Sequence, residues 1–247
     1  MSRILNYTDL TDEELAGLNK EKTVVFLPLS PLEAHGPHLP LGTDFLMAGH
    51  LAKVLAERLV RQKTFETALL LPPVPLGAGG IRRTGTIEHG VLLVEQAIVE
   101  YGEHLSKYGF KKGIIVSGHA GERHLKAMSE ASDVLRAIDR FDFLALTSYL
   151  FSEQGMARMK ARLKEGFTQG QPALLPPYDG HAGCWETSLA LVFFPQLVRQ
   201  KYRSLRPSES AEAHGYRGEP AKANTTIGEH LKEFLVETAL EVITTYW

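Results

Sequence analysis

The 247-residue chain has almost no cysteine, no marked excess of one charge and no long apolar run. Its single cysteine, Cys184, excludes an intrachain disulfide, which favours a reducing compartment. The formal net charge of −2 gives no electrostatic reason to expect a nucleic acid or an anionic membrane as partner. No apolar stretch approaches the roughly 20 residues that span a bilayer, and the first residues contain no apolar segment of signal-peptide length. We therefore expect a soluble, cytoplasmic protein.

The composition is that of a globular protein with one large core. Apolar residues make up 44% of the chain and charged residues 23%, which are ordinary values for a folded domain. The chain contains no internal repeat, low-complexity tract or clear linker. We expect a single domain over residues 1–247.

Short apolar runs alternate with amphipathic helical segments along most of the chain. The runs that read as strands are 23–30, 68–74, 113–117 and 141–149. The segments that read as helices are 8–18, 44–62, 88–108, 122–138, 186–194 and 226–245, with a basic helix at 156–164. This alternation predicts an α/β protein with a parallel sheet covered by helices. Ligands bind such sheets at the carboxyl ends of the strands, where loops 31–44 and 117–124 begin.

The first of these loops carries a dense cluster of candidate metal ligands. Glu33 and His35 are two residues apart, so their side chains point to the same side of an extended segment. Asp44 stands at a helix start, where one oxygen caps the helix and the other is free for a metal. Carboxylate oxygen and imidazole nitrogen are ligands that zinc, manganese and iron accept. The alternative is a polar loop with a capping aspartate, and His38 fits that alternative best.

The second loop follows the strand at 113–117 and contains His119 in a tight glycine turn. Glycine removes the steric barrier to a metal or substrate near the backbone, so His119 is a candidate ligand. Glu122 opens the next helix, where a carboxylate is favourable in any case because of the helix dipole. We expect His124 to lie on the helix surface.

A third cluster lies near the helix expected at 186–194. His181 is flanked by glycines, and we expect it to transfer a proton during catalysis. Glu186 is a candidate for the last metal ligand, or alternatively a simple first-turn carboxylate. Cys184 has no basic partner nearby in the sequence, so a packed small residue is favoured over a nucleophile.

Three motifs together resemble the creatininase (creatinine amidohydrolase) family. They are Glu33-x-His35-Gly-Pro-His-Leu-Pro-Leu-Gly-Thr-Asp44, Gly118-His119-x-Gly and His181-Ala-Gly-x-x-Glu186-Thr-Ser, within a resemblance that spans roughly residues 23–228. The resemblance implies a three-layer α/β/α fold with a mostly parallel central sheet. It implies two divalent metal ions, zinc or manganese with iron in some relatives. Asp44 would bridge the ions, with Glu33 and His119 on one and His35 on the other, and the chains would form a homo-oligomer, often a hexamer.

The sequence departs from creatininase near the second metal and near the substrate. Gly121 stands where creatininase carries an acidic metal ligand, so Glu186 or Glu122 has to complete that site. Gly180 replaces a glutamate directly before the histidine of the third motif. Arg82 and Arg83 stand in a glycine loop and suggest an anionic substrate group, although a solvated basic turn explains them equally well.

These observations predict a metal-dependent amidohydrolase that cleaves a C–N bond of a small cyclic amide or other non-peptide amide with metal-activated water. A formamide hydrolase of flavin or deazaflavin biosynthesis, and a peptidase that matures a peptide-derived cofactor, are alternatives within the family. A thiol hydrolase using Cys184 and a non-catalytic metal-binding scaffold are alternatives of other classes.

Overall fold

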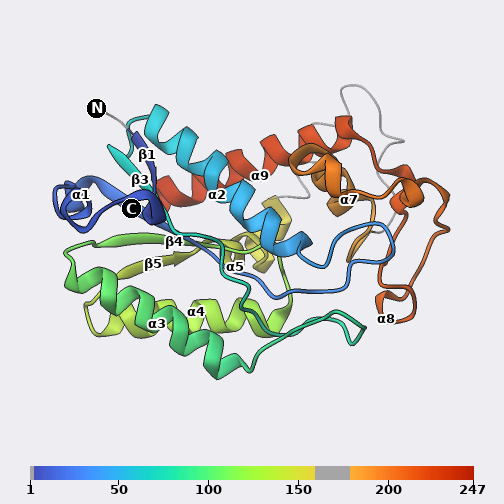
Figure 1. Cartoon of the computed structure of the whole chain (residues 1–247), viewed down its shortest axis with the longest axis horizontal. Coiled ribbons are helices and arrows are strands. Elements are labelled where there is room, and N and C mark those ends of the chain that lie inside the picture. The colour runs from blue at the N-terminus through green and yellow to red at the C-terminus, as the bar shows by residue number, and fades with distance from the viewer. Residues whose placement is uncertain (1–2, 159–178) are drawn as a thin grey trace.

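A five-stranded parallel sheet forms the centre of the computed structural model, which describes residues 3–158 and 179–247 (Figure 1). The strand order is β1-β3-β2-β4-β5, and every neighbouring pair is parallel. The strands are β1 (Arg3–Asn6), β2 (Thr23–Pro28), β3 (Thr67–Leu70), β4 (Lys112–Val116) and β5 (Asp142–Ala145). All six residues of the central strand β2 are buried. Burial of both faces explains why this strand reads as a continuous apolar run.

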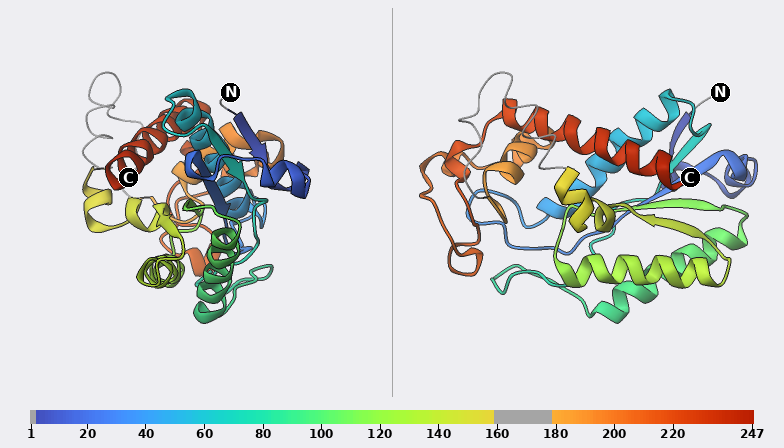
Figure 2. Two further views of the ribbon diagram at one scale, coloured as in Figure 1. Left: turned by 90° about the vertical axis from the view of Figure 1, so that its left-hand side faces the viewer. Right: turned by 180° about the vertical axis from the view of Figure 1, so that it is seen from behind.

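Helices cover both faces of the sheet, as Figures 1 and 2 show. They are α2 (Thr43–Arg61) and α9 (Thr225–Tyr246) on one face, and α3 (Val91–Lys107) and α4 (Glu122–Ala137) on the other. Side chains of β2 alternate between the two cores, because Phe26 packs beneath α2 and α9 while Val25 and Leu27 pack beneath α3 and α4. The predicted three-layer α/β/α fold is confirmed.

A third apolar cluster packs α7 (Cys184–Phe193) against Met47 of α2 and against Ile227, Leu231 and Phe234 of α9. Helix α7 packs directly against α9. The contact is close, because a Cβ on Gly228 of α9 would lie 2.1 Å from the Ser188 carbonyl oxygen of α7. This packing brings the start of α7 to the carboxyl ends of β2 and β4. The remaining helices are α1 (Asp12–Ala16), α5 (Leu146–Leu150), α8 (Ala211–His214) and the 3-10 helices η1 (Tyr7–Asp9), η2 (Lys20–Lys22), η4 (Pro195–Leu197), η5 (Gln200–Ser204) and η6 (Pro220–Lys222).

Two features of the fold differ from the sequence-based expectations. The strand expected at 141–149 ends at Ala145, and α5 follows it. The pairing ends with Ala145 opposite Ile115, and β4 itself ends one residue later at Val116, so most of the expected strand beyond Ala145 would have no partner in β4. Edge strand β1 was not predicted. Of the basic helix expected at 156–164, residues 156–158 are helical and the rest lies outside the described residues. Among the described helices, none combines the length and apolarity needed to cross a membrane.

Candidate metal centre

Candidate ligands from distant parts of the chain meet at the carboxyl edge of the sheet. Glu33 and His35 lie in the loop after β2, and His119 follows the neighbouring strand β4. Asp44 lies in the first turn of α2, and Glu186 in the first turn of α7. Glu33, His35 and Asp44 are at most 2% exposed. Burial of ionisable groups to this degree is costly unless other charges or a metal compensate them.

The described residues form three candidate ligand groups, of which one joins Glu33, His35 and His181 and the other two, the first and second triads, share Asp44. In the first triad, His119 Nδ1 lies 2.9 Å from Glu33 Oε2 and 3.3 Å from Asp44 Oδ2. In the second triad, His35 Nε2 lies 3.1 Å from Asp44 Oδ1 and 3.7 Å from Glu186 Oε2. Asp44 therefore presents a different carboxylate oxygen to each triad, which is the arrangement of a bridging ligand between two cations.

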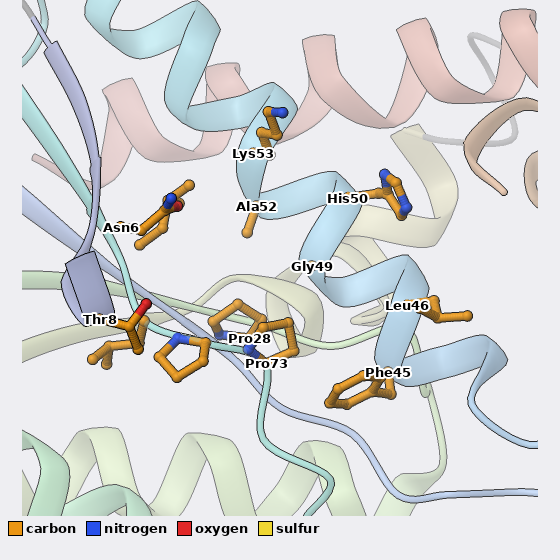
Figure 3. Close-up of a pocket in the computed structure, with 13 residues that line it drawn as sticks. Asn6, Thr8, Pro28, Phe45, Leu46, Gly49, His50, Ala52, Lys53 and Pro73 are labelled. Carbon is orange, nitrogen blue, oxygen red and sulfur yellow. The ribbon is translucent and has the colours of Figure 1, made fainter.

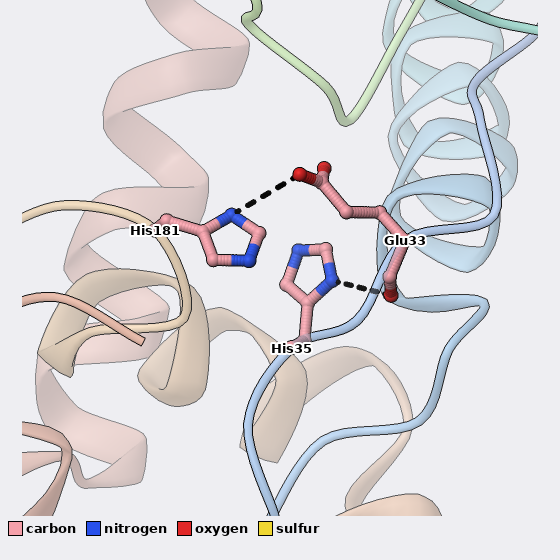
Figure 4. Close-up of side chains that lie close together, drawn as sticks. All are labelled: Glu33, His35 and His181. Carbon is pink, nitrogen blue, oxygen red and sulfur yellow. Dashed lines mark hydrogen bonds and ion pairs between the residues drawn. The ribbon is translucent and has the colours of Figure 1, made fainter. Parts of the chain in front are cut away.

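Backbone carbonyls orient two of the imidazole rings, and Figure 4 shows the one that holds His35. His35 Nδ1 lies 2.9 Å from the Glu33 carbonyl oxygen. A carbonyl only accepts, so Nδ1 donates and Nε2 is the nitrogen that faces the second triad. In the same way, His181 Nε2 donates to the Ala34 carbonyl at 2.7 Å and leaves Nδ1 facing Glu33 Oε1 at 3.9 Å. A histidine whose second nitrogen bonds a carbonyl is typical of metal sites.

Several polar atoms at the centre have no hydrogen-bond partner among the described residues. They include Glu33 Oε2, His35 Nε2 and Asp44 Oδ2. Each of these atoms lies close to an oppositely charged group, but the directions do not suit a hydrogen bond. Buried polar atoms left in this way are rare in proteins. Three buried polar atoms that converge without bonding one another are the arrangement expected of ligands around a cation.

The acid–base balance of the centre also fits cation binding. Burial opposes protonation of His35, but the charge of Asp44 prevails and raises the pKa to about 9. Burial opposes protonation of His119 as well, yet the close carboxylates of Asp44 and Glu33 raise its pKa to about 10. Burial would raise the pKa of Asp44, but the charge of His35 holds it well below its usual range. In the metal-free protein, protons on the histidines therefore balance the carboxylates, and a bound metal would displace them.

A backbone amide holds the second carboxylate of each triad, which is Glu33 in the first triad and Glu186 in the second. The Ile81 amide donates to Glu33 Oε1 at 2.7 Å, and the Ala182 amide donates to Glu186 Oε2 at 2.5 Å. Asp179 caps the start of α7 by accepting from the amides of Cys184 and Trp185. Burial raises the pKa of Asp179 to about 6, although those amides oppose the shift. This capping role of Asp179 was not predicted, although an aspartate five residues before a helix start is a signal for it.

A buried hydroxyl network supports the turn that carries His119. Ser117 Oγ lies 2.9 Å from Ser30 Oγ and 3.1 Å from His124 Nε2, and it accepts from the His119 amide at 3.0 Å. His124 is 0% exposed, so the prediction of a surface position is wrong. It continues the inward face of α4, four residues before Met128. Burial, together with the charge of His119, lowers the pKa of His124 to about 4.

Two other positions considered from the sequence belong to none of the candidate ligand groups of the described residues. Glu122 is exposed and joins no ligand group of the described residues, whereas Glu186 lies with His35 and Asp44. His38 is buried and bonds Thr187 at 2.9 Å.

Cys184 is also buried, and burial raises the pKa of its thiol to about 12. A thiol with this pKa stays protonated at neutral pH, which disfavours a thiol nucleophile.

A separate cavity of about 300 Å³ opens between α2 and the ends of β1 and β3 (Figure 3). Polar and apolar residues line it together, including Asn6, Thr8, Phe45, His50 and Lys53. None of the candidate metal ligands lines this cavity. The metal centre is therefore a distinct, more deeply buried site.

Fold and site together define an α/β protein with a candidate two-metal centre at the carboxyl edge of a parallel sheet. The chain belongs to the creatininase family, because the family model, described as creatinine amidohydrolase, matches residues 8–243. The resemblance stated from the sequence motifs is thereby confirmed.

Curated relatives support this family, and a solved structure supports the fold. The chain is 30% identical over 177 residues to a mycofactocin precursor peptide peptidase of Mycolicibacterium smegmatis, a match covering 71% of this chain and 60% of that protein. It is 25% identical to a creatinine amidohydrolase of Pseudomonas putida, with 71% and 66% covered. The match thus spans only about 60% of the mycofactocin relative's length. A creatininase variant of Zn-Zn type shares the fold, with a TM-score of 0.72, 20% identity and 99% of both chains covered.

Proposed function

We propose that this protein is a metal-dependent amidohydrolase that cleaves a C–N bond of a small amide. The observation that carries the proposal is the division of Asp44 between two ligand triads, one oxygen for each. A scaffold without turnover has no need for such a strained concentration of buried charge. The oxygen and nitrogen donor set suits zinc or manganese, with iron as a further candidate.

Each residue of the centre has a proposed role. Glu33 and His119 would hold one ion and His35 and Glu186 the other, with Asp44 as a ligand to both. When bound, two divalent ions lower the pKa of water towards neutrality and polarise the amide carbonyl. Glu186 replaces the acidic ligand that is missing at Gly121, because its carboxylate lies beside His35 and Asp44.

His181 is the proposed proton carrier. Its Nε2 is engaged with the Ala34 carbonyl, so Nδ1 is the nitrogen that accepts and returns a proton. Nδ1 faces Glu33, and the ring lies 4.2 Å from the His35 ring. This position beside both triads allows His181 to protonate the leaving nitrogen, a contribution of about 10²–10⁴-fold in rate.

A peptide substrate is the second candidate. The 30% identity to a mycofactocin precursor peptide peptidase supports it, whereas the relative from Pseudomonas putida is named for a cyclic amide. A formamide remains a third substrate class for the same site. The homo-oligomer and the cytoplasmic location stay predictions.

Metal analysis combined with a substrate panel tests this proposal. Elemental analysis of purified protein should find about two divalent ions per chain, and a chelator should abolish hydrolysis that Mn²⁺ or Zn²⁺ restores. The panel should contain cyclic amides, formamides and short peptides, with product release measured for each. Protein that holds no ion and takes none up from Mn²⁺ or Zn²⁺ would refute the metal centre. Loaded protein that leaves every amide intact would support the scaffold alternative instead.

A further inference from the structure

The rim of the metal centre is formed by residues 80–86 and 211–217. The first of these segments is tied to a metal-site carboxylate, since the Ile81 amide donates to Glu33 Oε1. Thr86 Oγ1 accepts from the Ala34 amide at 3.2 Å, one residue from His35. The segment between Ile81 and Thr86 is therefore anchored at both ends to the loop that carries Glu33 and His35.

Arg83 of this rim is held in one place by neutral partners. Its guanidinium Nη1 donates to the carbonyl oxygens of Glu212 and Ala213, each at 2.8 Å. Its Nε lies 3.2 Å from the point where a Cβ on Gly215 would stand, and the Gly36 nitrogen lies 2.9 Å from the same point. Gly36 follows His35 directly. The guanidinium is thus fixed beside the backbone that carries a candidate metal ligand.

The charge of Arg83 is left without a carboxylate partner among the described residues. The Glu212 carboxylate accepts instead from the Arg82 backbone amide. Some arginines do have a carboxylate partner, as Arg58 has Glu233 at 2.6 Å, whereas Arg83 is held, within the described residues, by carbonyl oxygens alone. A guanidinium fixed by carbonyls keeps donors and full charge for an external anion.

A second arginine borders the proposed proton carrier. The Arg217 amide donates to the His181 carbonyl at 2.7 Å, and its aliphatic stem packs over Gly180. A Cβ at Gly180 would lie 3.2 Å from Arg217 Cδ, so a larger residue at this position would crowd the aliphatic stem of Arg217. Within the described part of the chain, the Arg217 guanidinium has no ion-pair partner either.

We infer that the substrate carries a carboxylate close to the scissile amide, and that Arg83 and Arg217 bind it at this rim. The inference rests on the proposed function and narrows its substrate class. Two divalent ions exceed the charge of Glu33, Asp44 and Glu186, so the loaded centre attracts an anion as well. The free C-terminal carboxylate of a short peptide or of an acylated amino acid has this chemistry.

Paired acid and amide probes test the inference on two independent readouts. The first readout is binding of N-acetylglycine and N-acetylglycinamide to metal-free protein, followed by ligand-observed NMR. The second is kcat/KM of metal-loaded protein for dipeptides and tripeptides with a free carboxylate or a carboxamide end. Carboxamide peptides with an aspartate side chain distinguish a C-terminal from a side-chain carboxylate. The variants are Arg83→Gln and Arg217→Gln, with Arg140→Gln, an exposed arginine before β5, as control.

We expect wild type and the control to bind N-acetylglycine but not its amide, and to prefer acid substrates. Arg83→Gln should reduce that preference about 10- to 100-fold, the usual effect of a lost charge-assisted hydrogen bond. A merely structural role would lower acid and amide rates equally, and that result would overturn the inference. Turnover without acid preference in wild type would overturn it while the proposed function stands. Arginine-dependent binding in a protein that hydrolyses no amide would uphold the anion site and refute the proposed function.

Discussion

The two triads that share Asp44 are built in different ways. The first triad, Glu33, Asp44 and His119, comes from the ends of adjacent strands and the first turn of α2, and all three residues are buried. The second triad adds Glu186, whose side chain is 32% exposed and whose position depends on the packing of α7 against α9. The ligands of the first triad are therefore held mainly by the sheet, whereas the second triad depends on a helix that packs onto the rest of the fold.

This difference predicts unequal ion affinities. Ligands fixed by a sheet lose little entropy when an ion binds, whereas a partly exposed ligand on a docked helix must be ordered and competes with water. We expect the first triad to hold its ion more tightly and to release it more slowly. Three kinds of variant can distinguish the two ion sites. The first removes the shared ligand Asp44, the second removes a ligand of one triad, and the third disturbs the residue beside a ligand.

The largest effect is expected for Asp44→Asn, because this residue faces both triads. The amide presents one oxygen where the carboxylate presents two, so the variant should hold less than one ion per chain and lose nearly all hydrolysis. Elemental analysis and turnover on the best substrate of the panel measure both effects. Asp133→Asn, an exposed change on α4, should retain wild-type metal content. Two tightly held ions in Asp44→Asn would exclude a bridging role.

Glu186→Gln should affect the second triad alone. It removes the charge from that half but keeps an oxygen for the Ala182 amide. We expect the variant to keep about one tightly bound ion and to need excess Mn²⁺ or Zn²⁺ for activity, which titration calorimetry measures. Glu122→Gln is the matched control, since Glu122 also lies in the first turn of a helix but is exposed. A larger loss in the Glu122 variant would transfer the ligand role to that residue.

Gly121→Ala should weaken the first triad more than the second. Gly121 precedes α4 with an ordinary φ of −63°, so alanine strains no backbone there. Its Cβ, however, would lie 2.2 Å from His119 Nε2 and would displace the ring. We expect about 10- to 100-fold weaker binding of one ion, a typical effect of disturbing a ligand's support. Gly90→Ala is a matched control, because Gly90 precedes α3 with φ −65° and its Cβ would meet nothing within 4 Å.

The sequence predicted the rigid half of the molecule better than the docked half. Periodicity identified β2 to β5 and their crossover helices, because buried parallel strands have an unmistakable apolar pattern. It missed β1, whose four residues pair with one neighbour only and have no buried member. Motif spacing named Glu186 as a candidate but left Glu122 open, since the choice depends on how α7 packs on α9. His124 was misplaced for a related reason: a histidine on an inward helix face looks like a surface residue until its partner Ser117 is located.

The smallest effect concerns His124, which supports the first triad through Ser117. Its pKa is lowered to about 4 in the folded protein, against about 6.5 in an unfolded chain. The unfolded chain therefore binds more protons between these values, and stability is lost as the pH falls from about 6.5 to about 4. Between pH 7 and pH 5 this group should cost metal-free protein about 2 kcal/mol.

Urea unfolding of metal-free protein at pH 7 and pH 5 measures this cost. His124→Gln cannot titrate, so its stability should fall by about 2 kcal/mol less than that of wild type over the interval. His104→Gln, a change of an exposed histidine on α3, should follow wild type. An equal fall in wild type and His124→Gln would mean that His124 is protonated in the folded state. In that case the hydroxyl network beneath His119 would carry a charge, and the first triad would lose its advantage in rigidity over the second.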